Sequence, residues 1–252
     1  SLFSIGREPL SAYEVLRFFW LTIRRLCIKI IGSERLDRWL WRLGFFHAKS
    51  HLLRRIWTAP DGNRITFRPM EETIFKEIYE DKVYASCHIP EDGTIVDCGA
   101  HIGIFALYAA RRCPRGRVLA LEPSPLNREL LQHNVRFNRL ANIEIFPWAV
   151  SDHRGSGEIH FGGEYANDYC LRPTFGDKSQ ISIPVELRSL EDIFEEGGIL
   201  RCDLLKIDIE GSELVALRGG NRALARTRQV MLEIHKLAVD PREIVSIIEA
   251  QG

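Results

Sequence analysis

The 252-residue sequence lacks the paired cysteines of a metal-binding or disulfide-rich protein. Its six cysteines are scattered, with no Cys-x-x-Cys pair and no cluster of Cys with His. This distribution argues against a structural zinc site and predicts reduced thiols in the cytosol. His47 and His51 are four residues apart, but no carboxylate or cysteine accompanies them. We therefore expect a solvated helix face at these histidines and assign no metal.

Net charge and long apolar runs are absent too. Lys and Arg together number 34, as do Asp and Glu, so the overall charge gives no indication of a nucleic-acid partner. Basic residues interrupt the apolar helical pattern of residues 13–31, which makes it a poor membrane span. No small-residue cleavage site follows it, as one would follow a secretory signal. The sequence also has no internal repeat and no low-complexity run.

The charges that are present are unevenly distributed. Residues 1–70 hold 13 Lys and Arg against 5 Asp and Glu, and the rest of the chain is acidic. We predict an N-terminal helical appendage with a β-hairpin over residues 1–70 and one α/β domain over residues 71–252. Within this basic appendage, residues 13–31 and 34–46 have helical spacing. The first of these helices either packs on the main domain or on a second subunit, or lies on an anionic membrane surface.

The chain is organised around residues 94–105, which read TIVDCGAHIGIF. Their apolar start predicts a buried parallel strand that ends at Asp97. Gly99 and Gly103 bracket a turn into a helix, whose backbone N–H groups and dipole would attract an anionic group, and Gly99 would let a ligand approach the backbone. The D-x-G-A-x-x-G spacing differs from the G-x-G-x-x-G fingerprint for a dinucleotide, which disfavours a nicotinamide dehydrogenase.

Two more predicted strands follow, at residues 117–121 and 143–146. The first ends at Glu122, where a carboxylate can accept hydrogen bonds from both hydroxyls of a ribose. Residues after the second would lie beside an adenine ring. Trp148 there is either an apolar wall of that site or part of the core.

Further along, residues 203–208 and 229–235 predict two adjacent parallel strands. Ionisable groups at strand ends are costly unless they are paired or used. A structural pairing of Glu233 with His235 is the alternative to a functional role. Together the two strands would deliver four such groups to one cleft: Asp208, Glu210, Glu233 and His235.

An insertion rich in Gly and aromatic residues spans residues 155–177, with one short strand at 158–161, and an alternating strand follows it at 181–187. We expect it to cover the carboxyl ends of the parallel strands, where ligands bind in open α/β sheets. Its Tyr165, Asp168 and Tyr169 are candidate substrate contacts, and a loop without chemistry is the alternative.

Five blocks in order resemble the FkbM family of class I S-adenosylmethionine-dependent methyltransferases: VDCGAHIGIFALYAA, ALEPSP, WAVSDHRG, LLKIDIEGSELVALRGG and VMLEIH. The resemblance runs from about Ile74 to the C-terminus, and one departure is His101, where the family usually has Asn. It implies an α/β Rossmann-like sheet with helices on both faces, S-adenosyl-L-methionine as cofactor, and O-methylation of a sugar, glycan or polyketide-like hydroxyl. This fold normally adds strands beyond the helix before Gly252, and no initiating Met is present, so we expect trimmed ends or a fragment.

The motifs and the resemblance together define a candidate site. We expect Asp208, Glu210 or His235 to take the proton of the acceptor hydroxyl, with Glu233 beside His235. The same carboxylates could hold a divalent cation, but no spacing demands one. The residues expected to bind the cofactor are Asp97, Gly99, Ala100, His101, Gly103, Glu122, Pro123, Trp148 and Ala149.

Two other functions are left open by these patterns. One is an RNA methyltransferase that uses the basic N-terminus to hold its substrate, although we expect no nucleic-acid partner. The other is a cofactor-binding interaction module without turnover. The partners we expect are a small-molecule or glycan acceptor and, through the N-terminal helix, a membrane surface or a second copy of the chain. We expect a cytoplasmic protein, with membrane association as the open alternative.

Overall fold

The computed structural model describes residues 54–68, 71–161, 169–170, 181–234 and 241–249. The predicted helices of the appendage and the pair His47 and His51 lie outside these residues. Arg54–Gly252 form one compact unit by their internal contacts. The predicted domain boundary at residue 70 therefore stays a prediction.

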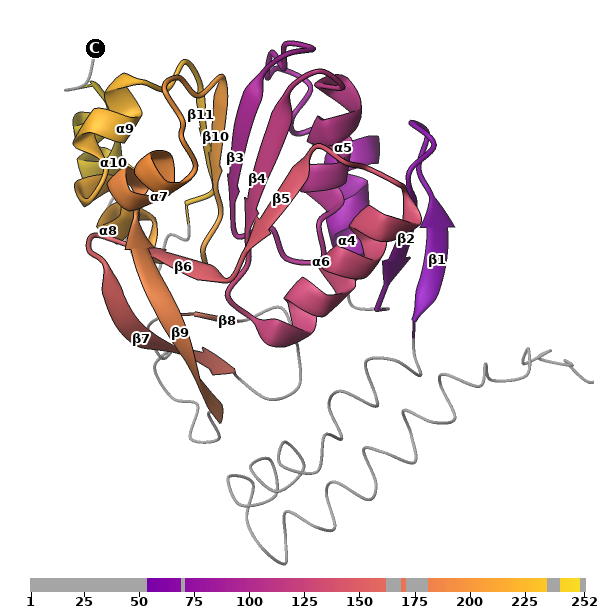
Figure 1. Ribbon diagram of the computed structural model, residues 1–252, viewed down its shortest axis with the longest axis horizontal. Helices are drawn as coiled ribbons and strands as arrows, with labels where there is room; N and C mark the ends of the chain where they lie inside the picture. Colours follow the sequence, from indigo (N-terminus) through magenta and orange to yellow (C-terminus); the bar gives the residue numbers. More distant parts are fainter. Residues whose placement is uncertain (1–53, 69–70, 162–168, 171–180, 235–240, 250–252) are drawn as a thin grey trace, which may run out of the picture. The chain divides into compact units, whose positions relative to one another are not determined.

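A five-stranded parallel sheet forms the centre of this unit (Figure 1). Its order is β11-β10-β3-β4-β5, from β3 Thr94–Cys98, β4 Arg117–Leu121, β5 Ile143–Phe146, β10 Leu204–Ile207 and β11 Val230–Leu232. Every pairing in the sheet is parallel. The chain leaves β3 toward β4 on one side and returns to β10 on the other. The carboxyl ends of β3 and β10 therefore form a topological switch point, where ligands bind in such sheets.

Helices cover both faces of this sheet, as the sequence predicts (Figure 1). One apolar core contains side chains of α5 Ile104–Arg112 and α6 Pro125–Phe137. The other contains side chains of α7 Leu190–Glu196, α8 Glu213–Arg218, α9 Asn221–Ala225 and α10 Pro241–Glu249. Because both faces are covered, Ile95, Val96, Leu119 and Leu205 have no exposed surface, which explains why their strands are apolar throughout.

The predicted hairpin is present and packs against α6. Strand β1, Arg55–Thr58, pairs antiparallel with β2, Arg64–Phe67. The side chain of Asn134 on α6 accepts from the backbone N–H of Thr66 at 2.8 Å and donates to its carbonyl at 3.0 Å. The helix predicted after the hairpin consists of a short α-helix, α4 Glu72–Phe75, and a π-helix, η2 Lys76–Glu80.

A second sheet lies beside the first, in the order β6-β9-β7-β8. Its strands are β6 Trp148–Ser151, β7 Gly155–Phe161, β8 Tyr169–Cys170 and β9 Ile181–Ser189. No strand was predicted at Trp148–Ser151, which pairs in parallel with Glu186–Ser189. This pairing partner lies almost 40 residues further along the chain, so no local pattern reveals it.

Candidate functional site

A cavity lies at the carboxyl ends of the parallel strands. The residues that line it follow β3, β4, β10 and β11, and others come from η2, α5 and β6. Its ionisable side chains, in chain order, are Glu77, Tyr84, His101, Glu122, Lys206, Asp208, Glu210 and Glu233. Five of these eight, His101, Glu122, Asp208, Glu210 and Glu233, were expected from the sequence, so the structure brings most of the predicted groups into one place.

Glu122 lies at the tip of β4, and its carboxylate is oriented by two backbone N–H groups. Oε2 accepts from His101 N at 2.8 Å, and Oε1 accepts from Ser124 N at 2.8 Å. Burial raises the pKa of Glu122 to about 7, against the lowering effect of these hydrogen bonds. Each carboxylate oxygen has a further lone pair, so this buried group can still accept from the hydroxyls of a ribose.

The glycine turn after β3 has the left-handed backbone that its sequence predicts. Gly99 has φ +82° and Gly103, the N-cap of α5, has φ +90°. Packing gives a second reason for glycine at position 99, because a Cβ there would overlap the carbonyl oxygen of Asp208, directly after the neighbouring strand β10. A Cβ at Gly103 would overlap the side chain of Leu131. The turn is therefore fixed by packing against β10 and α6 before any ligand is considered.

His101 occupies a third left-handed position in this turn, with φ 52°. Asn is among the residues that adopt this conformation most readily, and His is also enriched there, which accounts for the departure from the family pattern. Its ring nitrogens are buried and have no hydrogen-bond partner in the described part of the chain. Burial, with a smaller effect of Arg68 and Lys206, lowers the pKa of His101 well below its usual value. The ring is therefore a neutral N–H donor for a ligand.

The predicted cofactor residue Asp97 does not line the cavity. Its side chain has no exposed surface, and Oδ1 lies 3.2 Å from Nζ of Lys206. Lys206 lines the cavity and also approaches Asp208 Oδ2 at 3.3 Å and the Gly99 carbonyl at 3.4 Å. The two carboxylates raise the pKa of Lys206 well above its usual value despite burial, so the ammonium is charged.

The sequence analysis missed Lys206, Glu77 and Tyr84. A lysine in the middle of the apolar strand 204–207 is the signal that could have identified Lys206, since an unpaired buried charge is costly. Glu77 belongs to η2, and burial followed by the charges of Glu233 and Asp208 raises its pKa. Burial likewise raises the pKa of Tyr84 to about 12, so its hydroxyl stays protonated.

The loop after β10 presents two of the predicted catalytic groups to the cavity. Asp208 is held by Lys206, and Glu210 has a left-handed backbone with φ 52°. The buried carboxylate of Glu213 accepts from Gly211 N at 3.0 Å. Glu213 thereby holds the loop that carries Glu210.

Strand β11 is shorter than predicted, and Glu233 follows it directly. The backbone N–H of Glu233 donates to the carbonyl of Ile207 at 3.0 Å, which places Glu233 beside the end of β10. The predicted juxtaposition of these two strand ends is therefore present. His235, Tyr165 and Asp168 lie outside the described residues, as does the side chain of Tyr169.

An apolar wall of the cavity is formed by Pro123, Trp148 and Ala149, all predicted cofactor residues. The Trp148 ring stacks on Phe146, with centroids 4.4 Å apart, and the guanidinium of Arg188 lies 5.2 Å from it. Trp148 is also part of a core cluster, which confirms one of the two explanations left open by the sequence, and its place beside an adenine ring stays a prediction.

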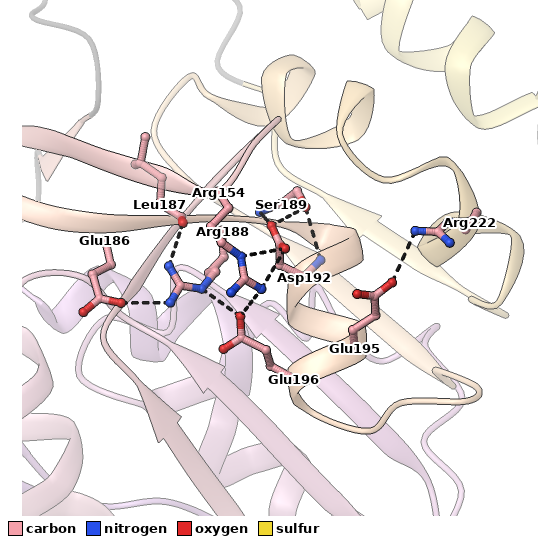
Figure 2. A network of polar contacts seen from close by, with 9 residues as sticks. All are labelled: Arg154, Glu186, Leu187, Arg188, Ser189, Asp192, Glu195, Glu196 and Arg222. Carbon is pink, nitrogen blue, oxygen red and sulfur yellow. Dashed lines mark hydrogen bonds and ion pairs between the residues drawn. The ribbon is translucent and has the colours of Figure 1, made fainter.

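A polar network holds Arg188 in this place (Figure 2). Arg188 donates to Glu186 at 3.0 Å and to Glu196 at 2.9 Å. Arg154 donates to Asp192 and Glu196 at the same helix, α7. The network joins β9, α7 and the turn before β7 and thereby fixes the cation above the Trp148 ring.

Within the described residues, no three side chains of His, Cys, Asp and Glu are grouped so as to hold a metal ion, and no helix there is long and apolar enough to cross a membrane. Cys87, Cys98, Cys113 and Cys202 are free thiols.

The site combines a doubly wound sheet with a carboxylate at the tip of β4 and a helix N-terminus beside the switch point. Together these features define a class I methyltransferase, which binds a nucleoside cofactor. S-adenosylmethionine fits the site. The carboxylate of Glu122 lies at the tip of β4, where a ribose would need acceptors, and the ring nitrogens of His101 have no hydrogen-bond partner among the described residues.

Comparison with known proteins identifies the family. The model of the methyltransferase FkbM domain matches residues 97–252. The antimetabolite synthetase AmbE of Pseudomonas aeruginosa is 32% identical over an alignment of 216 residues, and the match covers 70% of this chain and 10% of that protein. The 31-O-demethyl-FK506 methyltransferase FkbM of Streptomyces tacrolimicus is 28% identical over 71% of this chain and 80% of that protein. The hexuronic acid methyltransferase AglP of Haloferax volcanii is 27% identical over 63% of this chain and 62% of that protein.

The chain belongs to the FkbM family of S-adenosylmethionine-dependent methyltransferases. It spans about a tenth of the length of the Pseudomonas relative.

Proposed function

We propose that this chain methylates a hydroxyl oxygen of a small molecule or glycan. The proposal rests on one observation, the lining of the cavity. The cavity holds Glu122 at the tip of β4 and, across the ends of β3 and β10, the carboxylates of Asp208, Glu210 and Glu233. Names of relatives support it: one methylates a demethylated FK506 position named 31-O, and another a hexuronic acid.

The cofactor residues have distinct proposed tasks. Glu122 accepts from the ribose hydroxyls, while Pro123, Trp148 and Ala149 form the apolar wall for the adenine. The neutral ring of His101 and the first N–H groups of α5 donate to the carboxylate of the cofactor. Gly99, Ala100 and Gly103 shape the turn. Asp97 contributes indirectly, through its ion pair with Lys206. When bound, S-adenosylmethionine supplies an electrophilic methyl group.

A carboxylate or His235 receives the proton as the acceptor oxygen forms its bond to carbon. Lys206 already occupies one oxygen of Asp208, so we place the proton on Glu210 or on His235, with Glu233 beside it. Enclosure between the strand ends and the apolar wall brings the acceptor oxygen close to the methyl carbon, which contributes by proximity.

Methyl transfer is tested by incubating the protein with cell extract and methyl-labelled S-adenosylmethionine. Label should appear in a small-molecule or glycan fraction detected by mass spectrometry. A Glu122→Gln variant should transfer less label at low cofactor concentration, and Glu80→Gln, at an exposed position outside the cavity, should match the wild type. Label found only in RNA would support the RNA methyltransferase instead, and cofactor binding without any transfer would support the interaction module.

For the segment before residue 54, we propose a cytoplasmic position and a peripheral contact with an anionic membrane or a second copy of the chain. Its basic composition motivates this proposal. Flotation with vesicles of anionic and of neutral lipids, compared with sedimentation of the protein alone, separates the two contacts. A monomer that binds neither vesicle would contradict both.

A further inference from the structure

A buried arginine lies between the hairpin and the cofactor side of the cavity. Arg68 follows β2 directly, and its side chain is buried together with that of Glu71. Nε of Arg68 donates to Glu71 Oε1 at 2.6 Å, and the backbone N–H of Arg68 donates to Glu71 Oε2 at 2.6 Å. Nη2 contacts Oε1 as well. Both oxygens of one carboxylate therefore hold the guanidinium in a single orientation.

The same guanidinium reaches helix α6, 59 positions further along the chain. Nη2 of Arg68 donates to Oδ1 of Asn127 at 2.6 Å. A guanidinium has N–H donors and no acceptor, so the amide of Asn127 must turn its oxygen toward Arg68 and its nitrogen away from it. Asn127 lines the cavity. Arg68 thus determines how the Asn127 amide is presented there.

The amide nitrogen of Asn127 serves the carboxylate of Glu122. Burial raises the pKa of Glu122, whereas hydrogen bonds from two backbone N–H groups and from the Asn127 side chain lower it, as does the charge of Arg128. His101 meets this carboxylate through its backbone N–H. An ionised carboxylate only accepts hydrogen bonds, so Asn127 must donate to it. The amide orientation that Arg68 imposes is therefore the one that Glu122 requires.

We propose that Arg68 is a positioning residue for the cofactor, which fixes the amide of Asn127 and thereby keeps the Glu122 carboxylate turned toward the ribose of S-adenosylmethionine. The inference rests on the proposed role of Glu122. Arg68 lies outside residues 97–252, which match the family model, and it does not line the cavity. It acts on the cofactor through Asn127 and Glu122. A hydrogen bond to the charged form of a carboxyl group favours that form, so its loss should weaken binding most where Glu122 titrates.

The test measures binding of S-adenosylhomocysteine to the full chain by calorimetry, at a series of pH values on both sides of pH 7. The test variant combines Arg68→Met with Glu71→Gln, so that no buried charge is left without its partner. The matched control combines Arg54→Met with Glu129→Gln. It removes another ion pair that reaches α6, and neither residue lines the cavity.

An additional variant changes Asn127 and leaves the ion pair of Arg68 with Glu71 in place. Asn127→Asp has nearly the same shape as the wild-type side chain and still accepts from Arg68, but it offers Glu122 no N–H group. Two carboxylates would then face each other, which disfavours the ionised form of Glu122. Urea denaturation shows whether each variant is folded under the conditions of the calorimetry.

At pH 7 the variant Arg68→Met, Glu71→Gln should bind S-adenosylhomocysteine about tenfold more weakly than the wild type, because a hydrogen bond to a charged group is lost. The pH below which affinity falls should move upward, since the free Glu122 then holds its proton more tightly. Asn127→Asp should show both effects, and the matched control neither. In a Glu122→Gln background, Arg68→Met, Glu71→Gln should cause no further loss.

Wild-type affinity and an unchanged pH profile in either test variant would overturn the inference. An equal loss of affinity in the Glu122→Gln background would overturn it too, because Arg68 would then act by another route. If Arg68→Met, Glu71→Gln does not fold, Asn127→Asp with and without Glu122→Gln distinguishes the same outcomes. If Glu122→Gln alone binds like the wild type at every pH, the proposed role of Glu122 fails, and this inference with it.

Discussion

Nζ of Lys206 lies 3.2 Å from Oδ1 of Asp97, a carboxylate with no exposed surface. The pair joins β10 to β3 beneath the cavity and continues to Asp208. Through Lys206 it links the glycine turn after β3 to the loop after β10.

Lys206→Met should destabilise the protein strongly, because it leaves the Asp97 carboxylate buried without its partner. The expected loss of unfolding free energy is about 3–5 kcal/mol, measured by urea denaturation at neutral pH. The double variant Asp97→Asn, Lys206→Met should recover most of this loss, since no charge then remains unpaired. A loss under about 1 kcal/mol for the single variant would mean that the pair is not formed.

Cofactor binding should weaken as the pH falls below 7. Burial raises the pKa of Glu122 to about 7, and hydrogen bonds from ribose hydroxyls favour the carboxylate, so the bound pKa is lower than the free pKa. Affinity should thus be constant above pH 7 and fall by up to about tenfold per unit below it. Calorimetry in two buffers of different ionisation enthalpy should show proton release, and Glu122→Gln should remove it.

Gly99→Ala should be far more damaging than Gly198→Ala. Both glycines have positive φ, at +82° and +57°, but only a Cβ at Gly99 meets backbone, that of Asp208. Gly198→Ala should cost about 1 kcal/mol from backbone strain alone. Gly99→Ala should cost more and also weaken cofactor binding, because the turn must shift. Equal thermal and denaturant midpoints for the two variants would contradict the close approach of β10.

His101→Asn should make stability less sensitive to acid. The folded pKa of His101 lies below the unfolded value of about 6.5, so the native state disfavours protonation. The contribution of neutral His101 to the free energy of unfolding is intact above pH 6.5 and is lost as the pH falls toward the lowered pKa. The free energy of unfolding then changes by up to about 1.4 kcal/mol per pH unit. The difference between wild type and variant isolates this effect from the carboxylates, and a constant difference between pH 5 and pH 7 would refute it.

Loss of the proton acceptor should reduce turnover by about two to four decades without changing cofactor affinity. We expect this for Glu210→Gln or His235→Ala. If His235 is the base, the rate should rise with pH near the ordinary His value of about 6.5. If only Asp208→Asn reduces turnover in this way, Asp208 is the proton acceptor instead. If magnesium stimulates turnover and chelation abolishes the effect, a metal ion is bound by these carboxylates.

The sequence by itself determined the central sheet and one half of the site. The apolar runs of β3, β4 and β10 and the glycine turn are local patterns, and they predict the strands to within one residue at each end because burial on both faces demands apolar residues. Glu122 was predictable for the same reason, as an acidic residue directly after an apolar strand.

The tertiary structure decided which charges are used and which are paired. Asp97 seemed a cofactor ligand from its position in the motif, yet it pairs with Lys206, more than a hundred residues away. Glu77 joins Asp208 and Glu233 only because η2 packs beside the ends of β10 and β11, and β6 exists only because β9 pairs with it. Coulomb energies and strand pairing depend on distances between remote segments, which periodicity along the chain does not contain.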